Sequence, residues 1–220
     1  FSLRAGCTSS SNSTIDETHF KVLSQSKVYD GKYRQIISKR VEFPNNGKIN
    51  EFEVLSNHGL PSVTCFCWDV KNKCTTLVKE YHPGPEKYLW GTINGQYEES
   101  QGGKHSSPAQ CAAFELAEEA ELEAPPDNFV PMLGPGSSSG GMPMDKYTDN
   151  RFFPFLVLNP SPVAEVNRRE QDEEEFIEVA SGLNYHDVME LIGEGKINLV
   201  STYTILLGFK TLDSLGIEYK

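Results

Sequence analysis

Cysteine, positive charge and long apolar runs are all scarce in this sequence. Five cysteines occur among 220 residues, an odd number with no C-x-x-C pair, which argues against a disulfide framework and gives no spacing for zinc. No apolar run reaches the roughly 18 residues that span a bilayer. With 20 basic against 31 acidic side chains, the net charge of −11 argues against a nucleic-acid surface held by phosphate contacts.

What is present indicates a folded chain with a buried core. Hydrophobic residues make up 38% and aromatic residues 10%, which suits one large domain or a domain with a small appendage. The first residue is Phe, and residues 1–18 are rich in Ser and Thr with Arg4 as their one basic residue. We expect the remains of an organellar transit peptide there, plastid or mitochondrial, or else an ordinary disordered terminus of a cytoplasmic protein.

Residues 19–58 carry the pattern of a small antiparallel β unit. Polar and apolar residues alternate through it, and Asn46-Gly47 supplies the positive φ angles of a tight turn. Residues 59–220 then form the larger predicted domain. The two-residue spacing of Cys65 and Cys67 in a strand-like run puts both thiols on one face, where we expect them to be buried.

The larger domain mixes strands and helices, which favours an α+β fold with a mixed-sheet sandwich. We predict a hairpin of strands 62–70 and 74–80, a short buried strand 88–90, a loop over 94–107 and a helix over 107–123 capped by Ser107. Further strands are expected at 152–158 and 176–179. Helices are expected at 186–194 and from a Ser201 cap onward, with Ile205, Leu206, Phe209 and Leu212 inward.

The helix over 107–123 is unusual in its charge. Glu115, Glu118 and Glu119 stand at i, i+3 and i+4, so they share one face and repel one another. No Lys or Arg between Ser107 and Asn128 offsets this repulsion. A divalent cation such as Mg²⁺ or Mn²⁺, which prefers oxygen ligands, would remove it. The alternatives are a solvated acidic face and a surface for a basic partner.

The segment 107–119 resembles the helical half of the Nudix box, in which the glutamates of R-E-U-x-E-E carry the catalytic metal. Its flanks resemble the ADP-ribose and ADP-sugar pyrophosphatase branch at four places: Val28–Lys32, Lys79–His82, Leu89–Gly95 and Glu174–Val179. The likeness covers roughly residues 20–212. It implies an α/β/α sandwich with a mixed sheet, and an N-terminal β unit that in this branch often helps to build a homodimer.

The sequence also departs from the family pattern. Glu115 follows Gly95 by 20 residues, where the box places this glutamate 15 residues after its glycine. Phe114 replaces the arginine that braces the loop to the helix, and Glu121 replaces the glycine after the helix. His82 stands at the branch's strand arginine. Asn150 stands where a glutamate often serves as general base.

The resemblance implies roles for individual residues. Glu115, Glu118 and Glu119 would bind the metal, and His82, Gly95 and Glu98 would contact substrate. Glu98, Glu99 and Gln101 are candidates for the place of the first box glutamate. Beside the catalytic Glu118 and Glu119, the candidate bases are Asp145 and Asp149.

Two main functions are expected from this pattern. The first is a metal-dependent hydrolase of a nucleoside diphosphate linked to another moiety, of the ADP-ribose or ADP-sugar type. The second is a catalytically impaired Nudix-fold subunit that acts as a binding or scaffold component of a larger complex, for example a complex in an organelle. A sensor that binds such ligands without turnover is a minor alternative.

Overall fold

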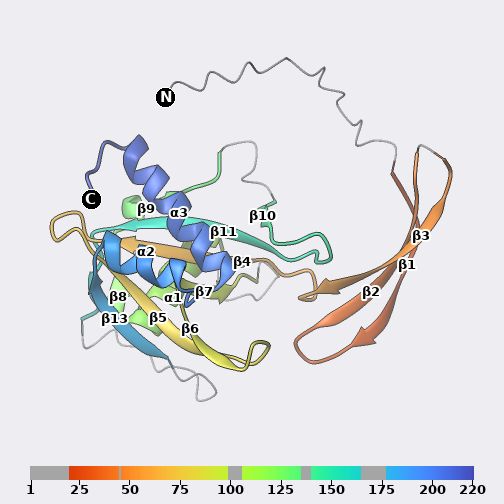
Figure 1. The fold of residues 1–220 in the computed structure, drawn as a ribbon, viewed down its shortest axis with the longest axis horizontal. Coiled ribbons are helices and arrows are strands. Elements are labelled where there is room, and N and C mark those ends of the chain that lie inside the picture. The colour runs from red at the N-terminus through yellow and green to blue at the C-terminus, as the bar shows by residue number, and fades with distance from the viewer. Residues whose placement is uncertain (1–19, 45, 99–105, 135–139, 165–176) are drawn as a thin grey trace, which may run out of the picture. The chain divides into compact units, whose positions relative to one another are not determined.

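A computed structural model describes residues 20–44, 46–98, 106–134, 140–164 and 177–220. The chain divides into two compact units, Phe1–Leu55 and Ser56–Lys220, and each is described by itself. Figure 1 shows the ribbon of the chain. In the described ranges, no helix combines the length and the apolar character needed to cross a membrane.

The N-terminal unit is a three-stranded antiparallel sheet in the order β1-β2-β3. Its strands are β1 (Lys21–Asp30), β2 (Gln35–Glu42) and β3 (Ile49–Ser56). Gly47 has a φ of 64°, as the predicted turn requires. All ten residues of β1 are exposed. The predicted antiparallel β unit is therefore confirmed, and its first strand contributes no buried side chain.

Two larger sheets form the frame of Ser56–Lys220. The first has the order β10-β11-β4-β7 with β9 beside β11, and its central strands β4 and β11 are parallel. The second is antiparallel in the order β13-β5-β6. The strands of these sheets are β4 (Ser62–Trp68), β5 (Thr75–His82), β6 (Lys87–Gly91), β7 (Ile93–Gln96), β9 (Phe129–Pro131), β10 (Met142–Pro143), β11 (Arg151–Leu158) and β13 (Glu178–Leu183).

Three helices cover these sheets: α1 (Pro108–Ala120), α2 (Tyr185–Gly193) and α3 (Leu199–Ser214). Strand β4 separates two core clusters because its side chains alternate between its faces. Val63, Cys65 and Cys67 join the cluster that contains residues of α1, and Phe66 and Trp68 join the cluster that contains residues of α2 and α3. The result is the predicted α/β/α sandwich with a mixed sheet.

The two predicted strands, 62–70 and 74–80, are present as β4 and β5, but their predicted pairing as a hairpin is wrong. β4 and β5 belong to different sheets, and they are joined by the bridge Asp69↔Cys74 and by the hydrogen bond from Thr75 Oγ1 to the Cys67 carbonyl. The predicted loop over 94–107 also contains a strand, because residues 93–96 pair with β4 as β7. Short apolar runs carry no information about which sheet a strand joins, so alternation alone cannot separate these arrangements.

Helix boundaries differ from the predictions at two places. α1 ends at Ala120 because Glu121 adopts a left-handed conformation with a φ of 51°, and β8 (Leu122–Glu123) pairs with β12 (Ser161–Pro162). The N-cap of α3 is Asn198, whose side chain accepts a hydrogen bond from the Ser201 amide; the predicted Ser201 cap is wrong. Leu206 is 45% exposed, so its predicted inward position is wrong as well.

Candidate active site

Helix α1 positions the predicted metal ligands. Ser107 caps the helix by accepting a hydrogen bond from the Gln110 amide at 3.2 Å, and Pro108 occupies the first helical position, where no donor is needed. Cys111, Ala112 and Leu116 are fully buried and fix the rotation of the helix on its sheet. This rotation leaves the three glutamates at the border of the buried face.

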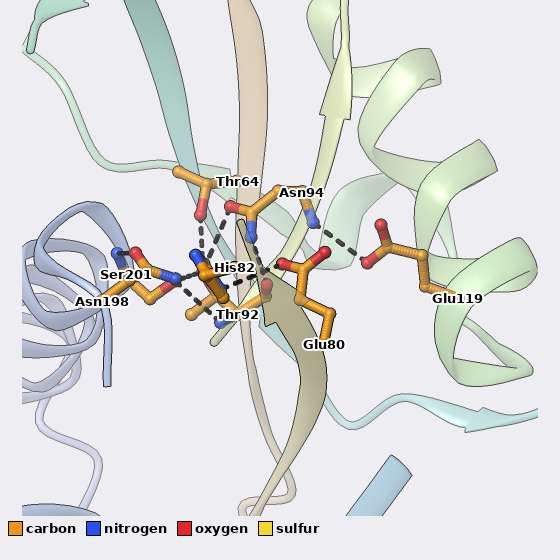
Figure 2. A network of polar contacts seen from close by, with 8 residues as sticks. All are labelled: Thr64, Glu80, His82, Thr92, Asn94, Glu119, Asn198 and Ser201. Carbon is orange, nitrogen blue, oxygen red and sulfur yellow. Dashed lines mark hydrogen bonds and ion pairs between the residues drawn. The ribbon is translucent and has the colours of Figure 1, made fainter. Parts of the chain in front are cut away.

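Glu119 is the most buried of the three carboxylates, with 8% of its surface exposed. Its Oε2 accepts a hydrogen bond from the backbone N–H of Asn94 at 3.1 Å, as Figure 2 shows. A buried carboxylate is costly unless hydrogen bonds compensate for its lost hydration. The hydrogen bond from β7 therefore offsets part of the hydration that the Glu119 carboxylate loses on burial.

Glu115 lies directly on the backbone of the same strand. A Cβ built on Gly95 would overlap the carboxyl group of Glu115, so a glycine is needed there for this approach. Glu118 belongs to the same helical turn and is half-buried. Strand β7 thus receives two carboxylates of α1, one at Asn94 and one at Gly95.

Buried thiols lie beside these carboxylates. The Sγ of Cys111 is 4.0 Å from Oε1 of Glu115 and donates to the carbonyl of Gln96 at 3.5 Å. Burial raises the pKa of Cys111 to about 12, and the charges of Glu115 and Glu98 add to the effect. Burial likewise raises the pKa of Cys65, with Cys67, Glu119, Cys111 and Glu115 adding to it in that order. The thiols are therefore neutral at pH 7, and Glu98 lies within electrostatic reach of the Cys111 thiol.

His82 is the last residue of β5, and the resemblance implies that it contacts substrate. Its Nε2 lies 3.7 Å from Oε1 of Glu80, which is too long for a hydrogen bond. This nitrogen is buried and has no hydrogen-bond partner among the described residues, although the side chain is 24% exposed. A histidine nitrogen in this state can bond to a ligand oxygen that reaches it. Its role in substrate binding remains a prediction.

The candidate bases lie in the loop between β10 and β11. Asp145 is exposed, and its Oδ1 accepts the Tyr147 amide at 2.8 Å. Asp149 is half-buried, and its Oδ1 is enclosed without a hydrogen-bond partner in the described parts of the chain. Such an orphaned oxygen suits a group that bonds to substrate or water only during function. Of the two carboxylates, only Asp149 has a buried oxygen left unbonded among the described residues, and the role of either one as a base remains a prediction.

Asn57 connects this loop to β7. Its backbone N–H donates to Oδ1 of Asn150 at 2.8 Å, and its Nδ2 donates to Oε1 of Gln96 at 3.2 Å. Asn150, which replaces the family's expected glutamate, is thus used as a structural acceptor. The other predicted positions, Glu99, Gln101 and the segment 1–18, lie outside the described residues.

Three carboxylates supply only oxygen donors, and this donor chemistry fits Mg²⁺ or Mn²⁺. Within the described ranges, no group of three or more His, Cys, Asp or Glu side chains is arranged to hold a metal. Glu115 and Glu119 both lie against β7. The assignment of Glu115, Glu118 and Glu119 to a metal remains a prediction.

Four residues that shape this site were not predicted to belong to it: Asn57, Thr92, Asn94 and Ser201. Asn57, Thr92 and Asn94 lie in or next to strands, and Ser201 lies in the first turn of α3. Small polar residues are common at turns and helix starts, so residue type alone does not single out any of the four. Only the fold brings them to the carboxylates. The unusual polarity of Thr92 and Asn94 within an apolar strand pattern is the one signal that the sequence offers.

No protein-family model and no curated protein matches the sequence. The fold, in contrast, is that of the Nudix hydrolases, with a mixed sheet between α1 on one side and α2 and α3 on the other. One similar solved structure is the crystal structure of an ADP compounds hydrolase, with a TM-score of 0.68 and 18% sequence identity. The match covers 90% of this chain and 97% of that chain.

Proposed function

We propose that this protein is a metal-dependent hydrolase of ADP compounds, which cleaves the diphosphate of a nucleoside diphosphate joined to another group. ADP-ribose and ADP-sugars are the first substrates to test. The observation that carries this proposal is the placement of Glu115 and Glu119 against Asn94 and Gly95 in a Nudix fold. The likeness to an ADP compounds hydrolase supports the substrate class.

Glu115, Glu118 and Glu119 would hold Mg²⁺ or Mn²⁺. When bound, such a cation neutralises the charge of the diphosphate and lowers the pKa of bound water. Gly95 lets the carboxyl group of Glu115 lie on the strand, and the Asn94 amide keeps Glu119 oriented. The helix therefore presents its carboxylates from a rigid support, which favours metal binding.

The remaining residues would bind substrate and move a proton. His82 Nε2 would donate to a phosphate oxygen, since it is buried without a partner among the described residues. Asp149 would accept the proton of the attacking water, in the role of general base. Glu98, near Cys111, would occupy the place of the first box glutamate.

Hydrolysis of a panel of ADP-ribose and ADP-sugars with Mg²⁺ or Mn²⁺ tests this proposal. Mutation of a residue that hydrogen-bonds to a metal ligand typically lowers activity about 10- to 100-fold. Mutation of a ligand itself should lower activity at least as much, so Glu118→Gln should lower kcat/KM about 100-fold or more. Asp149→Asn should lower kcat by at least about 100-fold. Asp145→Asn is the matched control in the same loop and should remain near wild type. Hydrolysis that Glu118→Gln leaves unchanged would refute the assignment.

The second candidate is a catalytically impaired subunit of a larger complex. Phe114 in place of the bracing arginine, and Asn150 in place of the expected glutamate, favour it. Purification of the full chain from its source at native concentration would then yield stoichiometric partners. Turnover of about 1 s⁻¹ or more by the isolated protein would count against this alternative.

We also propose that the N-terminal unit contacts a second copy of the chain. Val22, Leu23, Val28 and Tyr29 leave β1 with exposed apolar side chains, and an exposed strand edge favours pairing. Sedimentation of the full chain should give a dimer, and Val28→Asp should shift it toward monomer. A monomer at all concentrations in the wild type would exclude this partner.

A further inference from the structure

The chain changes sheets at one buried residue beside the candidate site. It leaves β6 at Gly91, which pairs with Val78, and enters β7 at Ile93, which pairs with Cys65. Thr92 stands between the two strands and is fully buried. Its backbone N–H is outside both ladders, and a buried N–H needs a partner.

The first turn of α3 provides this partner. The Thr92 N–H donates to Oγ of Ser201 at 3.0 Å, and the two hydroxyl groups are 3.1 Å apart. The amide of Ser201 in turn donates to Oδ1 of the cap residue Asn198 at 2.9 Å. A Cβ on Gly91 would lie 3.0 Å from Asn198 Nδ2 and from Ser201 Oγ, so the glycine permits this close packing. Figure 2 shows Thr92, Asn198 and Ser201 together.

The connection continues from Thr92 to the carboxylate. The side chain of Asn94 donates from Nδ2 to the Thr92 carbonyl. The Thr92 hydroxyl lies 3.4 Å from Oδ1 of Asn94 and 2.7 Å from the hydroxyl of Thr64 on β4. The backbone N–H of the same Asn94 donates to Glu119. A continuous chain of hydrogen bonds therefore runs from α3, through the strand switch, to a glutamate of α1.

We propose that Thr92 and Ser201 are positioning residues for Glu119, because they fix the strand switch that aims the Asn94 amide at its carboxylate. The expected effect of these residues on metal binding rests on the proposed function, whereas their effect on the orientation of Glu119 does not. The pairing of β7 with β4 spans only four residue pairs and begins after Thr92. The entry of the strand is therefore held by Ser201 of α3 together with the Thr64 hydroxyl of β4, which is 2.7 Å from that of Thr92.

The test is the chemical shift of the Asn94 amide proton in the full-length, metal-free protein. The difference between wild type and Glu119→Ala, which has no side-chain acceptor at this position, defines the signature of the hydrogen bond. Thr92→Val and Ser201→Ala should move the Asn94 resonance most of the way toward the Glu119→Ala position. Thr92→Ser retains the hydroxyl and should restore the wild-type position.

Thr204→Val is the control for the loss of a buried hydroxyl. Thr204 is also buried in α3, but its hydroxyl donates to the Val200 carbonyl of its own helix. This variant should leave the Asn94 resonance in place even where the unfolding temperature falls. Should Ser201→Ala fail to fold, Thr92→Val still tests the proposal, because it keeps the Thr92 N–H bond and removes the hydroxyl contacts. A wild-type Asn94 resonance in the folded variants would overturn the proposal.

Mn²⁺ binding measured by electron paramagnetic resonance separates this inference from the proposed function. Ser201→Ala should weaken Mn²⁺ binding about 10-fold, as the loss of an outer support does. A wild-type protein that binds no Mn²⁺ and hydrolyses nothing would remove the proposed function. The Asn94 shift would still decide whether Thr92 and Ser201 orient Glu119.

Discussion

The two faces of β4 carry side chains of different size. On the α1 face, β4 itself presents the small buried residues Val63, Cys65 and Cys67, within a cluster that also contains Tyr97, Phe129 and Phe155. The α3 face is aromatic, with Phe66, Trp68, Phe209 and Tyr219 in its cluster. The candidate site lies on the small-residue face. We infer that the aromatic α3 face stabilises the fold, and that the α1 face leaves room for Glu115 and Glu119 against the backbone of β7.

Ring geometry supports the structural role of the aromatic face. Phe209 contacts Phe66 and Trp68 edge to face, with centroid distances of 5.1 and 5.6 Å, and stacks on Tyr219 at 4.9 Å. Each such pair stabilises by about 0.5–1.5 kcal/mol beyond its buried area. Phe209 of α3 therefore contacts the rings of three other aromatic residues of this core.

The largest expected effect comes from breaking the aromatic face at that residue. Phe209→Ala should lower the free energy of unfolding by about 3–5 kcal/mol, measured by urea denaturation. Leu206→Ala, in the same helix but at an exposed position, should stay within about 0.5 kcal/mol of wild type. Equal losses in both variants would contradict the distinction between the two sides of α3.

Gly208 gives a smaller effect on the same face. A Cβ there would overlap the ring of Phe66, which the surrounding core holds in place. Gly208→Ala should destabilise by about 1–3 kcal/mol through overpacking, despite the better helix propensity of Ala. A thermal unfolding curve that shows stabilisation would mean that α3 can move away from β4 at little cost.

The small-residue face should respond to alkaline pH. Burial raises the pKa of Cys67 from 9.0 to about 12, so between these values the native thiol keeps a proton that the unfolded chain has lost. Stability must therefore fall as pH rises from about 9 toward 12, by up to about 1.4 kcal/mol per pH unit for this group. Cys67→Ala should make the slope shallower by that amount. Cys74→Ala, at a half-buried thiol, should change it less, and identical slopes in all three proteins would contradict the account.

The smallest effect on stability is expected at Gly95, the counterpart of Gly208 on the site face. A new Cβ there meets the flexible side chain of Glu115, which can rotate away. Gly95→Ala should therefore change the free energy of unfolding by less than about 1 kcal/mol. It should nevertheless weaken Mn²⁺ binding about 10-fold, since it displaces a carboxylate. Unaltered Mn²⁺ affinity, measured by calorimetric titration, would show that this position of Glu115 is unimportant.

Much of the fold was predictable because it depends on local patterns. The Ser107 cap, the Asn46-Gly47 turn and the strand at 152–158 follow from chemistry within a few residues. The assignment of β4 and β5 to different sheets was not predictable, because both are short apolar runs separated by a turn. Their partners, β11 and β13, are distant in the sequence.

The site was predictable only in part. The spacing of Glu115, Glu118 and Glu119 identified the helix face, but not which carboxylates would reach β7, because that depends on how α1 is rotated by its buried residues. The hydrogen bond between Thr92 and Ser201 joins positions that are 109 residues apart, so no local sequence pattern predicts it. Glu121 shows the opposite case, in which a left-handed cap expected of glycine is formed by another residue.

The central claim is that the carboxylates of α1 bind a divalent cation beside β7. A crystal structure of the full chain soaked in Mn²⁺, with anomalous diffraction at the manganese edge, tests it most directly. The account predicts a peak bonded to oxygens of Glu115, Glu118 and Glu119, and its loss in Glu119→Gln. An ordered α1 with no peak at these side chains at millimolar Mn²⁺ would contradict the account.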